Sequence, residues 1–207
     1  MTVARLQQGD SGYPSASHKY LGDRAPTTLT TLGNLGILQQ KKLALFCSVQ
    51  CPGSLILQTY DLACALRNAG VTVISGFHSL MEKECLTLLL RGTQPVIVCP
   101  ARSIERMRTP SAWKASLAEG RLLVLSPFAE KRHRITTDLA QRRNEFVAVL
   151  ADAVFVTHAV PGSKTERFCR TVLTWGKPLL TFESGENSAL LALGVRTVQP
   201  NLIAEEW

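Results

Sequence analysis

The stretch LALFCSVQCPGSLILQTYDLACALRNAGVTVIS, residues 43–75, decides the fold. It begins and ends with short runs, 43–47 and 71–75, in which nearly every residue is apolar, as in strands buried on both faces. Between them, residues 54–68 place apolar side chains at helical spacing, and Asn-Ala-Gly at 68–70 is a typical helix end. A strand, a helix and a second strand in this order predict a right-handed crossover in a parallel sheet.

The same alternation continues to the end of the chain. We predict strands at Leu43–Cys47, Val71–Ser75, Pro95–Cys99, Leu122–Ser126, Ala153–Thr157, Pro178–Phe182 and Val195–Val198. Helices are predicted at Ser54–Asn68, Met81–Arg91, Ser111–Glu119, Thr136–Leu150, Thr165–Trp175 and Ser188–Leu193. This pattern indicates an α/β fold with a doubly wound, mainly parallel sheet, an extended Rossmann-like arrangement of three αβα layers. The centre of the sheet is expected to bury Leu45, Ile74, Ile97, Val124, Val154 and Leu180.

The first 40 residues follow a different pattern. Gly and Pro interrupt any periodicity there, and Thr27–Thr31 is too polar for a core strand. We therefore expect residues 1–40 to be an N-terminal extension packed on a Rossmann-like domain formed by residues 41–207. The chain has no apolar run of the roughly 20 residues that span a bilayer and no secretory signal pattern at its start, so a cytoplasmic protein without membrane contact is expected.

Charge and cysteine content narrow the partners. The 207 residues carry 23 Lys and Arg against 16 Asp and Glu, a net charge of +7. A basic surplus favours nucleic acid as a partner, although by itself it is a weak indication. The six cysteines form no CxxC pair and lie in apolar segments, which favours buried thiols over disulfides or a metal site. No metal and no cofactor is predicted.

Ligands of a doubly wound sheet bind beyond the carboxyl ends of its strands, so the residues at these ends are the candidates. Ser48 follows the first predicted strand, and Ser75 and Gly76 end the second. An ordinary strand-to-helix turn explains these loops as well. After the fifth predicted strand, a helix begins at Gly162, Ser163, Lys164 and Thr165, where the helix dipole favours an anion. A capped helix start without a ligand is the alternative, and the GxxxxGK[ST] pattern of NTP hydrolysis is missing.

Arginine clusters supply the second indication of an anionic ligand. Cations gather at residues 130–134 and again at 142–143, and clustered arginines suit contact with a phosphate backbone. We predict that a single-stranded nucleic acid lies across the carboxyl ends of the strands, held by Arg142, Arg143, Lys164 and Arg167. Asn144 is expected to anchor the loop beneath them. A solvated charged face is the alternative.

Several segments, taken in order, resemble the DNA-processing protein A (DprA/Smf) family. Residues 23–33 are similar to its lead-in segment, and Gly70–Gly76 matches its G-x-x-V-V-S-G motif closely. Arg143-Asn144, followed by residues 146–156, resembles R-N-R-I-I-A-x-L-S-D-x-V-x-V. Gly162, Ser163 and Thr165 then fall near its S-G-S-L-x-T-A helix start. The resemblance covers roughly residues 20–198.

The resemblance implies an extended Rossmann fold that binds single-stranded DNA without cutting it, helps to load a recombinase and often forms homodimers. We accordingly expect a non-catalytic protein of DNA uptake and recombination. A homodimer is also favoured because the apolar segments Leu179–Phe182 and Leu190–Leu193 exceed what one small sheet edge needs to bury. RNA or a free nucleotide remains an alternative ligand. A nucleotide-sensing or nucleotide-derivative-hydrolysing domain, or an inactive partner-binding paralogue, remains an alternative function.

Five departures from the family pattern weaken the DNA contacts that it implies. Val49 replaces the basic residue of the family's Gly-Ser-Arg, and Glu145 replaces the second arginine of Arg-Asn-Arg. In addition, Leu80-Met81-Glu82 stands for Gly-Ile-Asp, Leu86 replaces a His, and His158 replaces a Glu.

Overall fold

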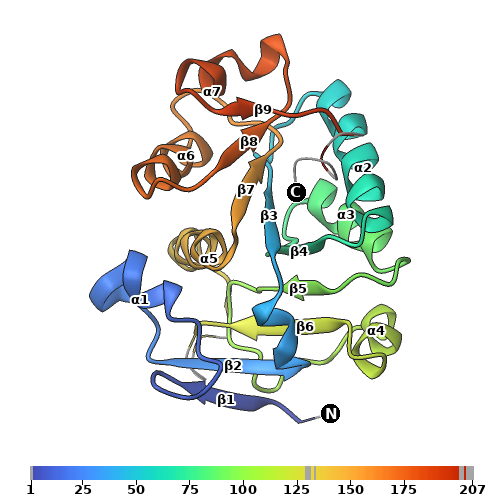
Figure 1. The fold of residues 1–207 in the computed structure, drawn as a ribbon, viewed down its shortest axis with the longest axis vertical. Coiled ribbons are helices and arrows are strands. Elements are labelled where there is room, and N and C mark those ends of the chain that lie inside the picture. Colours follow the sequence, from blue (N-terminus) through green and yellow to red (C-terminus); the bar gives the residue numbers. More distant parts are fainter. Residues whose placement is uncertain (1, 129–131, 133, 201–202, 204–207) are drawn as a thin grey trace.

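The computed structural model describes residues 2–128, 132, 134–200 and 203, and the strands of this part of the chain form one sheet (Figure 1). The strands are β1 (Ala4–Gln7), β2 (Thr28–Gly33), β3 (Lys42–Phe46), β4 (Thr72–Ser75), β5 (Val96–Val98), β6 (Leu122–Ser126), β7 (Ala153–Val156), β8 (Leu179–Thr181) and β9 (Arg196–Thr197). The α-helices are α1 (Ala16–Leu21), α2 (Gly53–Asn68), α3 (Leu80–Leu89), α4 (Lys114–Ala118), α5 (Thr137–Leu150), α6 (Lys164–Thr174) and α7 (Ser188–Ala192). Short 3-10 helices are η1 (Gly22–Arg24), η2 (Leu35–Gln39), η3 (Ser111–Trp113) and η4 (Gly185–Asn187).

The chain winds outward from β3 in both directions. The strand order is β1-β2-β6-β5-β4-β3-β7-β8-β9, and all pairs from β6 to β9 are parallel. The order reverses between β3 and β7, which makes their carboxyl ends the topological switch point of the sheet. The predicted doubly wound, mainly parallel α/β sheet is therefore confirmed.

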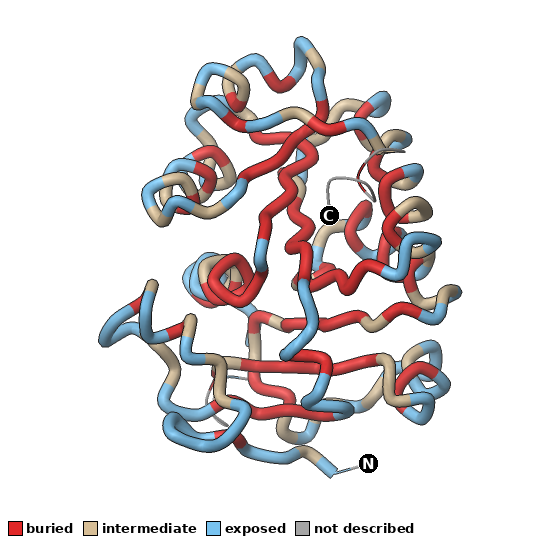
Figure 2. The backbone as a smooth tube through the Cα atoms, in the orientation of Figure 1, coloured by how far each residue is buried: buried red, intermediate tan, exposed pale blue. Residues whose placement is uncertain are grey.

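Helices cover both faces of this sheet. Figure 1 shows α2, α3 and α4 on one face and α1, α5 and α6 on the other. Successive strand residues point to opposite faces, so Leu43 and Leu45 pack in the core beneath α2, while Ala44 and Phe46 join the core beneath α5. Figure 2 shows the strands as the most continuously buried segments. The residues predicted for the centre of the sheet are confirmed as buried, with at most 2% exposure: Leu45, Ile74, Ile97, Val124, Val154 and Leu180.

The prediction that Thr27–Thr31 is too polar for a core strand is wrong. Residues Thr28–Gly33 form β2, which pairs antiparallel with both β1 and β6, and the residues from Leu29 to Leu32 are buried. Threonine is β-branched and favours extended backbone, and ladders on both sides satisfy the backbone of this strand. Gly33 ends the strand with φ of 110°, where a Cβ would lie 2.2 Å from the carbonyl oxygen of Leu122. The first 40 residues thus add two strands to the same sheet.

The cysteines are all free thiols. Burial raises the pKa of Cys85, Cys99 and Cys169 to about 12 in each case. These three therefore remain protonated and act as small apolar core side chains. Within the described residues, no helix is long and apolar enough to cross a membrane.

The apolar segments that favoured a homodimer are largely satisfied inside one chain. Leu179, Leu180, Phe182 and Leu190 are all buried against their own protomer. The surplus of apolar surface on which that expectation rested is therefore much smaller than the sequence indicates.

Candidate nucleic-acid interface

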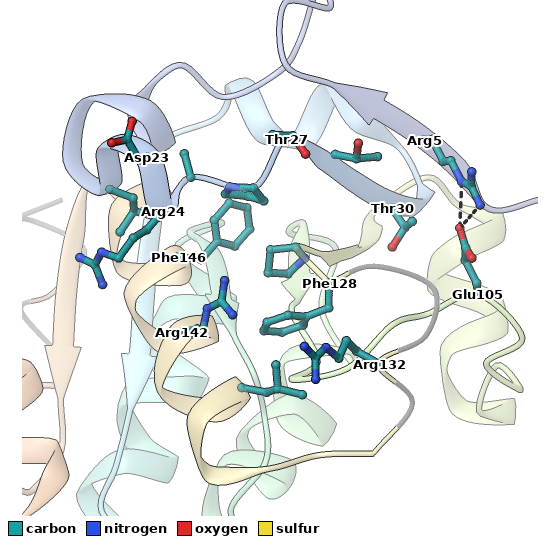
Figure 3. Close-up of a pocket in the computed structure, with 16 residues that line it drawn as sticks. Arg5, Asp23, Arg24, Thr27, Thr30, Glu105, Phe128, Arg132, Arg142 and Phe146 are labelled. Atoms are coloured by element: carbon teal, nitrogen blue, oxygen red, sulfur yellow. Dashed lines mark hydrogen bonds and ion pairs between the residues drawn. The ribbon is translucent and has the colours of Figure 1, made fainter.

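The carboxyl edge of the sheet carries three neighbouring cavities. The α5–α6 groove, of about 450 Å³, lies between the first turns of α5 and α6. The N-terminal pocket, of about 580 Å³, lies between segment 21–30, the residues after β6 and the side of α5 (Figure 3). The β4–β5 pocket, of about 190 Å³, lies where β4 and β5 end. Arg24 and Arg142 line both of the first two, which therefore adjoin.

The α5–α6 groove brings together the predicted residues Arg142, Asn144, Lys164, Thr165 and Arg167. Arg142 and Lys164 are exposed, and their side chains have no hydrogen bond or ion pair with any described residue. Arg167 donates from Nη1 to the carbonyl oxygen of Gly162 over 2.8 Å. The spacing of the sequence thus identified one surface on which cations from two separate helices meet.

Acidic side chains also line this groove, but one is already neutralised. The carboxylate of Glu145 accepts from Nη1 of Arg24 over 2.7 Å. Asp138 lies in the first turn of α5, where a negative charge suits the helix dipole. Glu145 stands where the resemblance implies an arginine. Because Arg24 pairs with the Glu145 carboxylate, this carboxylate repels a phosphate less than its charge alone indicates.

The β4–β5 pocket combines cations with aromatic walls. Arg102, Arg108 and Arg143 line it, and the described lining residues include no Asp or Glu. Phe77 and Trp113 supply aromatic surface. A small positive cavity with aromatic walls is suited to a phosphate beside a base.

Arg143 differs from its predicted role as a surface contact. It is 4% exposed, donates from Nη1 to the carbonyl oxygen of Cys99 over 3.0 Å and from Nε to Oδ1 of Asn144 over 2.7 Å. Burial lowers the pKa of this guanidinium. A Cβ on Gly76 would lie 1.0 Å from Arg143 Nη1, so Gly76 is the residue that makes room for it. Only Nη2 lacks a hydrogen-bond partner among the described residues, so Arg143 mainly holds the loops after β4 and β5 together.

The two predicted serines are also structural. Ser75 is fully buried and donates its hydroxyl to the carbonyl oxygen of Leu45 over 2.6 Å. Ser48 is buried, and its amide donates to the carbonyl oxygen of His158 over 3.1 Å, which ties the two loops of the switch point together. Neither serine lines any of the three cavities.

The predicted anion site at the start of α6 is filled by a carboxylate of the protein itself. The amide of Gly162 donates to Oε2 of Glu166 over 2.5 Å, and Ser163 Oγ accepts from the amide of Glu166 over 3.2 Å. The Gly162 amide, and next the guanidinium of Arg170, lower the pKa of Glu166. A phosphate would have to displace this carboxylate, so Gly162 and Ser163 do not form the open cradle that the sequence predicted.

A second internal carboxylate closes the loops after β3 and β4. Glu82 is buried and accepts from the amides of His78 over 2.8 Å, Ser79 over 3.2 Å and Cys47 over 3.2 Å. Ser79 in turn accepts from the amide of Glu82, which completes a capping box on α3. The amides of Cys47, His78 and Ser79 are therefore not open to a phosphate.

Some residues of this edge escaped the sequence analysis. Arg24 lines two cavities because α1 and η1 pack beside α5, which no local pattern reveals. Of the basic cluster at 130–134, the described members are Arg132, which lines the N-terminal pocket, and Arg134. Residues 130, 131 and 133 lie outside the described part of the chain. Among described residues, no group of three His, Cys, Asp or Glu is placed to hold a metal ion.

The fold and this edge define a Rossmann-like domain whose carboxyl side presents several arginine and lysine side chains. The chain belongs to the DNA recombination-mediator protein A family, whose model matches residues 5–192. The resemblance to DNA-processing protein A is thereby confirmed. A comparison with curated proteins found no match.

Solved structures agree with this assignment. DNA processing protein A from Streptococcus pneumoniae superposes with a TM-score of 0.79 at 20% identity, over 98% of this chain and 74% of that one. The Helicobacter pylori protein gives 0.79 at 19% identity, over 99% and 94%. The molybdenum cofactor binding protein of Rippkaea orientalis gives 0.56 at 14% identity, over 81% and 95%. At these identities the likeness is one of fold.

Proposed function

We propose that this protein binds single-stranded DNA along the carboxyl edge of its sheet and does not cleave it. The observation that carries the proposal is a row of cations without carboxylate partners among the described residues: Arg102, Arg108, Arg132, Arg142 and Lys164. The row crosses all three cavities, so a ligand with several phosphates can engage it along its length. Family membership supports the same ligand, because the related H. pylori structure is described by its single-stranded DNA binding mode.

The internal carboxylates favour this ligand over a free nucleotide. A nucleotide pyrophosphate relies on open amides at a helix start near the switch point. Glu82 and Glu166 already accept from amides of the loops after β3, β4 and β7, those of Cys47, His78 and Gly162. Side-chain cations remain, and they suit a polyanion that gathers one contact from each. The nucleotide-hydrolase alternative is correspondingly weaker.

An oligo-dT titration by fluorescence anisotropy tests the proposal. If about four phosphates are neutralised, log K should fall against log salt with a slope near −3, at roughly −0.7 per phosphate of a single strand. Arg142→Ala should lower the affinity for all sequences by a similar factor and make the slope shallower by about one contact.

The matched control is Arg91→Ala, which removes the same charge. Arg91 is exposed just after α3, at the opposite edge of the sheet. The control should leave both affinity and slope unchanged. No binding of oligo-dT to the wild-type protein at low salt would contradict the proposal, as would equal effects of the two substitutions.

Two further parts of the proposal rest on family membership alone. One is that the bound strand is passed to a recombinase, and the other is that two chains pair. Light scattering at tens of micromolar, a concentration chosen to detect modest interface affinities, tests the pairing. A monomer under those conditions would contradict it.

A further inference from the structure

The loop between β3 and α2 carries two cysteines to which the proposed function gives no role. Cys47 follows the last residue of β3, and Cys51 lies two residues before α2 begins at Gly53. The chain bends at Val49 and Gln50, which turns the two ends of this short loop towards each other. The two thiols form a hydrogen bond with each other. A covalent bond between them would require the sulfur atoms to move from this contact to about 2.05 Å.

The strand end of this loop is held firmly, whereas its middle has room to adjust. The Cys47 amide donates to Oε1 of Glu82 over 3.2 Å. The next amide, that of Ser48, donates to the carbonyl oxygen of His158 over 3.1 Å. Val49 is 90% exposed, and the residue after it is exposed as well. The segment between the two thiols can therefore change its bend without disturbing packed side chains.

The two thiols differ in reactivity. The hydrogen bond between them lowers the pKa of Cys51 and raises the pKa of Cys47, and burial, a smaller cause, raises both. Cys51 also lies beside the start of a 16-residue helix, where the helix dipole favours a thiolate. Both side chains are partly exposed, so a small oxidant can reach them. Cys51 is therefore the thiol expected to react first, with Cys47 in contact with it.

The other cysteines lack this combination of contact and exposure. Cys85, Cys99 and Cys169 are buried, and burial raises the pKa of each to about 12. Cys64 is partly exposed within α2, but no hydrogen bond joins it to another thiol of the described residues. The chain thus contains one pair of thiols that is suited to oxidation and four that are suited to packing.

We propose that Cys47 and Cys51 are a redox-active pair that a peroxide converts into a disulfide. The Cys51 thiolate attacks one oxygen of hydrogen peroxide, the O–O bond breaks, and protonation gives a sulfenic acid and one water. The Cys47 sulfur then attacks the Cys51 sulfur, the S–O bond breaks, and hydroxide leaves with the Cys47 proton as a second water. Two thiols are oxidised by two electrons and one peroxide is reduced. The proposed function is not needed for this step.

Peptide mass spectrometry of the full-length protein tests the proposal. The protein is treated with hydrogen peroxide, its remaining thiols are alkylated in denaturant, and it is digested with trypsin. Residues 43–67 form one tryptic peptide, which contains Cys64 as a third cysteine. After oxidation we expect this peptide to lack two hydrogen atoms and to carry one alkyl group, on Cys64. Its fragments should show no backbone cleavage between residues 47 and 51 until a reductant is added.

Three variants assign the roles within the pair. Cys64→Ser is the matched control, because it removes a thiol of the same peptide but not of the pair, and it should keep the bridge. Cys47→Ser should abolish the bridge and leave a sulfenic acid on Cys51, which dimedone captures. Cys51→Ser should abolish the bridge and leave Cys47 reduced, because the lowered pKa belongs to Cys51. A melting curve of each variant shows that it is folded.

The outcomes are decided against N-acetylcysteine, a small thiol oxidised in the same peroxide solution. A peptide that stays fully reduced while this thiol is oxidised would overturn the proposal. A bridge to Cys64, or a lasting sulfenic acid on Cys51 of the wild type, would also overturn it. If Cys47→Ser or Cys51→Ser fails to fold, the wild-type fragments and Cys64→Ser still decide. None of these measurements uses DNA, so a failure of oligo-dT binding would leave this inference standing.

Discussion

The contact between Gly76 and Arg143 gives the sharpest prediction for the fold of the site. A Cβ added at Gly76 would meet Arg143 Nη1 at 1.0 Å and Cζ at 1.8 Å. Arg143 would have to withdraw from its position between the loops after β4 and β5. It would then lose its hydrogen bonds to Cys99 and Asn144.

The expected loss of stability follows from these two hydrogen bonds. A hydrogen bond from a charged group contributes roughly 1.5–3 kcal/mol, and a carbonyl left buried without a partner adds to the loss. With partial relaxation, Gly76→Ala should lower the free energy of unfolding by about 3 kcal/mol. The backbone of Gly76 does not lie in the left-handed region, so backbone strain contributes nothing to this value.

A double-mutant cycle measured by urea unfolding checks the reasoning. In an Arg143→Ala background the obstruction is gone, so Gly76→Ala should change the free energy of unfolding by less than about 0.5 kcal/mol, a coupling of about 2–3 kcal/mol. Gly53→Ala is the control, because its Cβ would meet no atom within 4 Å and alanine there restricts the unfolded chain. An equal loss from Gly76→Ala in both backgrounds would refute the assignment of Arg143 as the neighbour that requires glycine.

Three further predictions concern charge. The Gly162 amide lowers the folded-state pKa of Glu166. The ionised carboxylate therefore contributes its full stability above the unfolded pKa of about 4.5, and this contribution is lost as the pH falls below that value. Glu166→Gln should reduce the fall in melting temperature that the wild type shows at acidic pH. Burial lowers the pKa of Lys177 to about 8 from 10.5, so between these two pH values the unfolded chain binds more protons than the folded protein. The stability of the wild type should therefore rise with pH in that window, and the stability of Lys177→Met should rise less. Val49 is 90% exposed at the end of β3, so Val49→Arg should strengthen oligo-dT binding and steepen its salt slope by about 0.7 without a loss of melting temperature; unchanged binding would mean that the strand does not pass this loop.

The sheet was predictable because its central strands are short apolar runs. Such runs are buried whatever the surrounding residues do, as Val154 and Ile97 illustrate. Strand β2 was not predictable in this way, since its threonines become core residues only through pairing with β1 and β6. Burial imposed by distant strands leaves no local pattern in the sequence.

The grouping of the candidate site residues was predictable from the sequence, but their hydrogen-bonding roles were predictable only in part. The rule that ligands bind at carboxyl strand ends pointed to side chains that the structure brings together in one groove, among them Arg142, Lys164 and Arg167. The spacing S-x-x-E at Ser163 and Glu166 is a readable helix-start signal, and it indicates that the Ser163 hydroxyl caps the amide of Glu166 instead of remaining open to a phosphate. The burial of Arg143 was not readable, because it depends on the space left by Gly76, 67 positions earlier in the chain.

The internal carboxylates set what kind of anion this edge can select. Because Glu82 and Glu166 occupy amides of Cys47, His78 and Gly162, the proposed affinity rests on separate side-chain cations, each with a modest contribution. A ligand that makes one phosphate contact loses only about 2.6-fold in affinity between 50 and 200 mM salt, whereas four contacts lose about 50-fold over the same range, at roughly 0.7 per phosphate. At low salt the affinity also depends on the number of contacts, because a strand gains affinity at each cation that it reaches, whereas a mononucleotide gains it at one cation only. If the proposed function is correct, this arrangement selects its ligand by length and backbone charge.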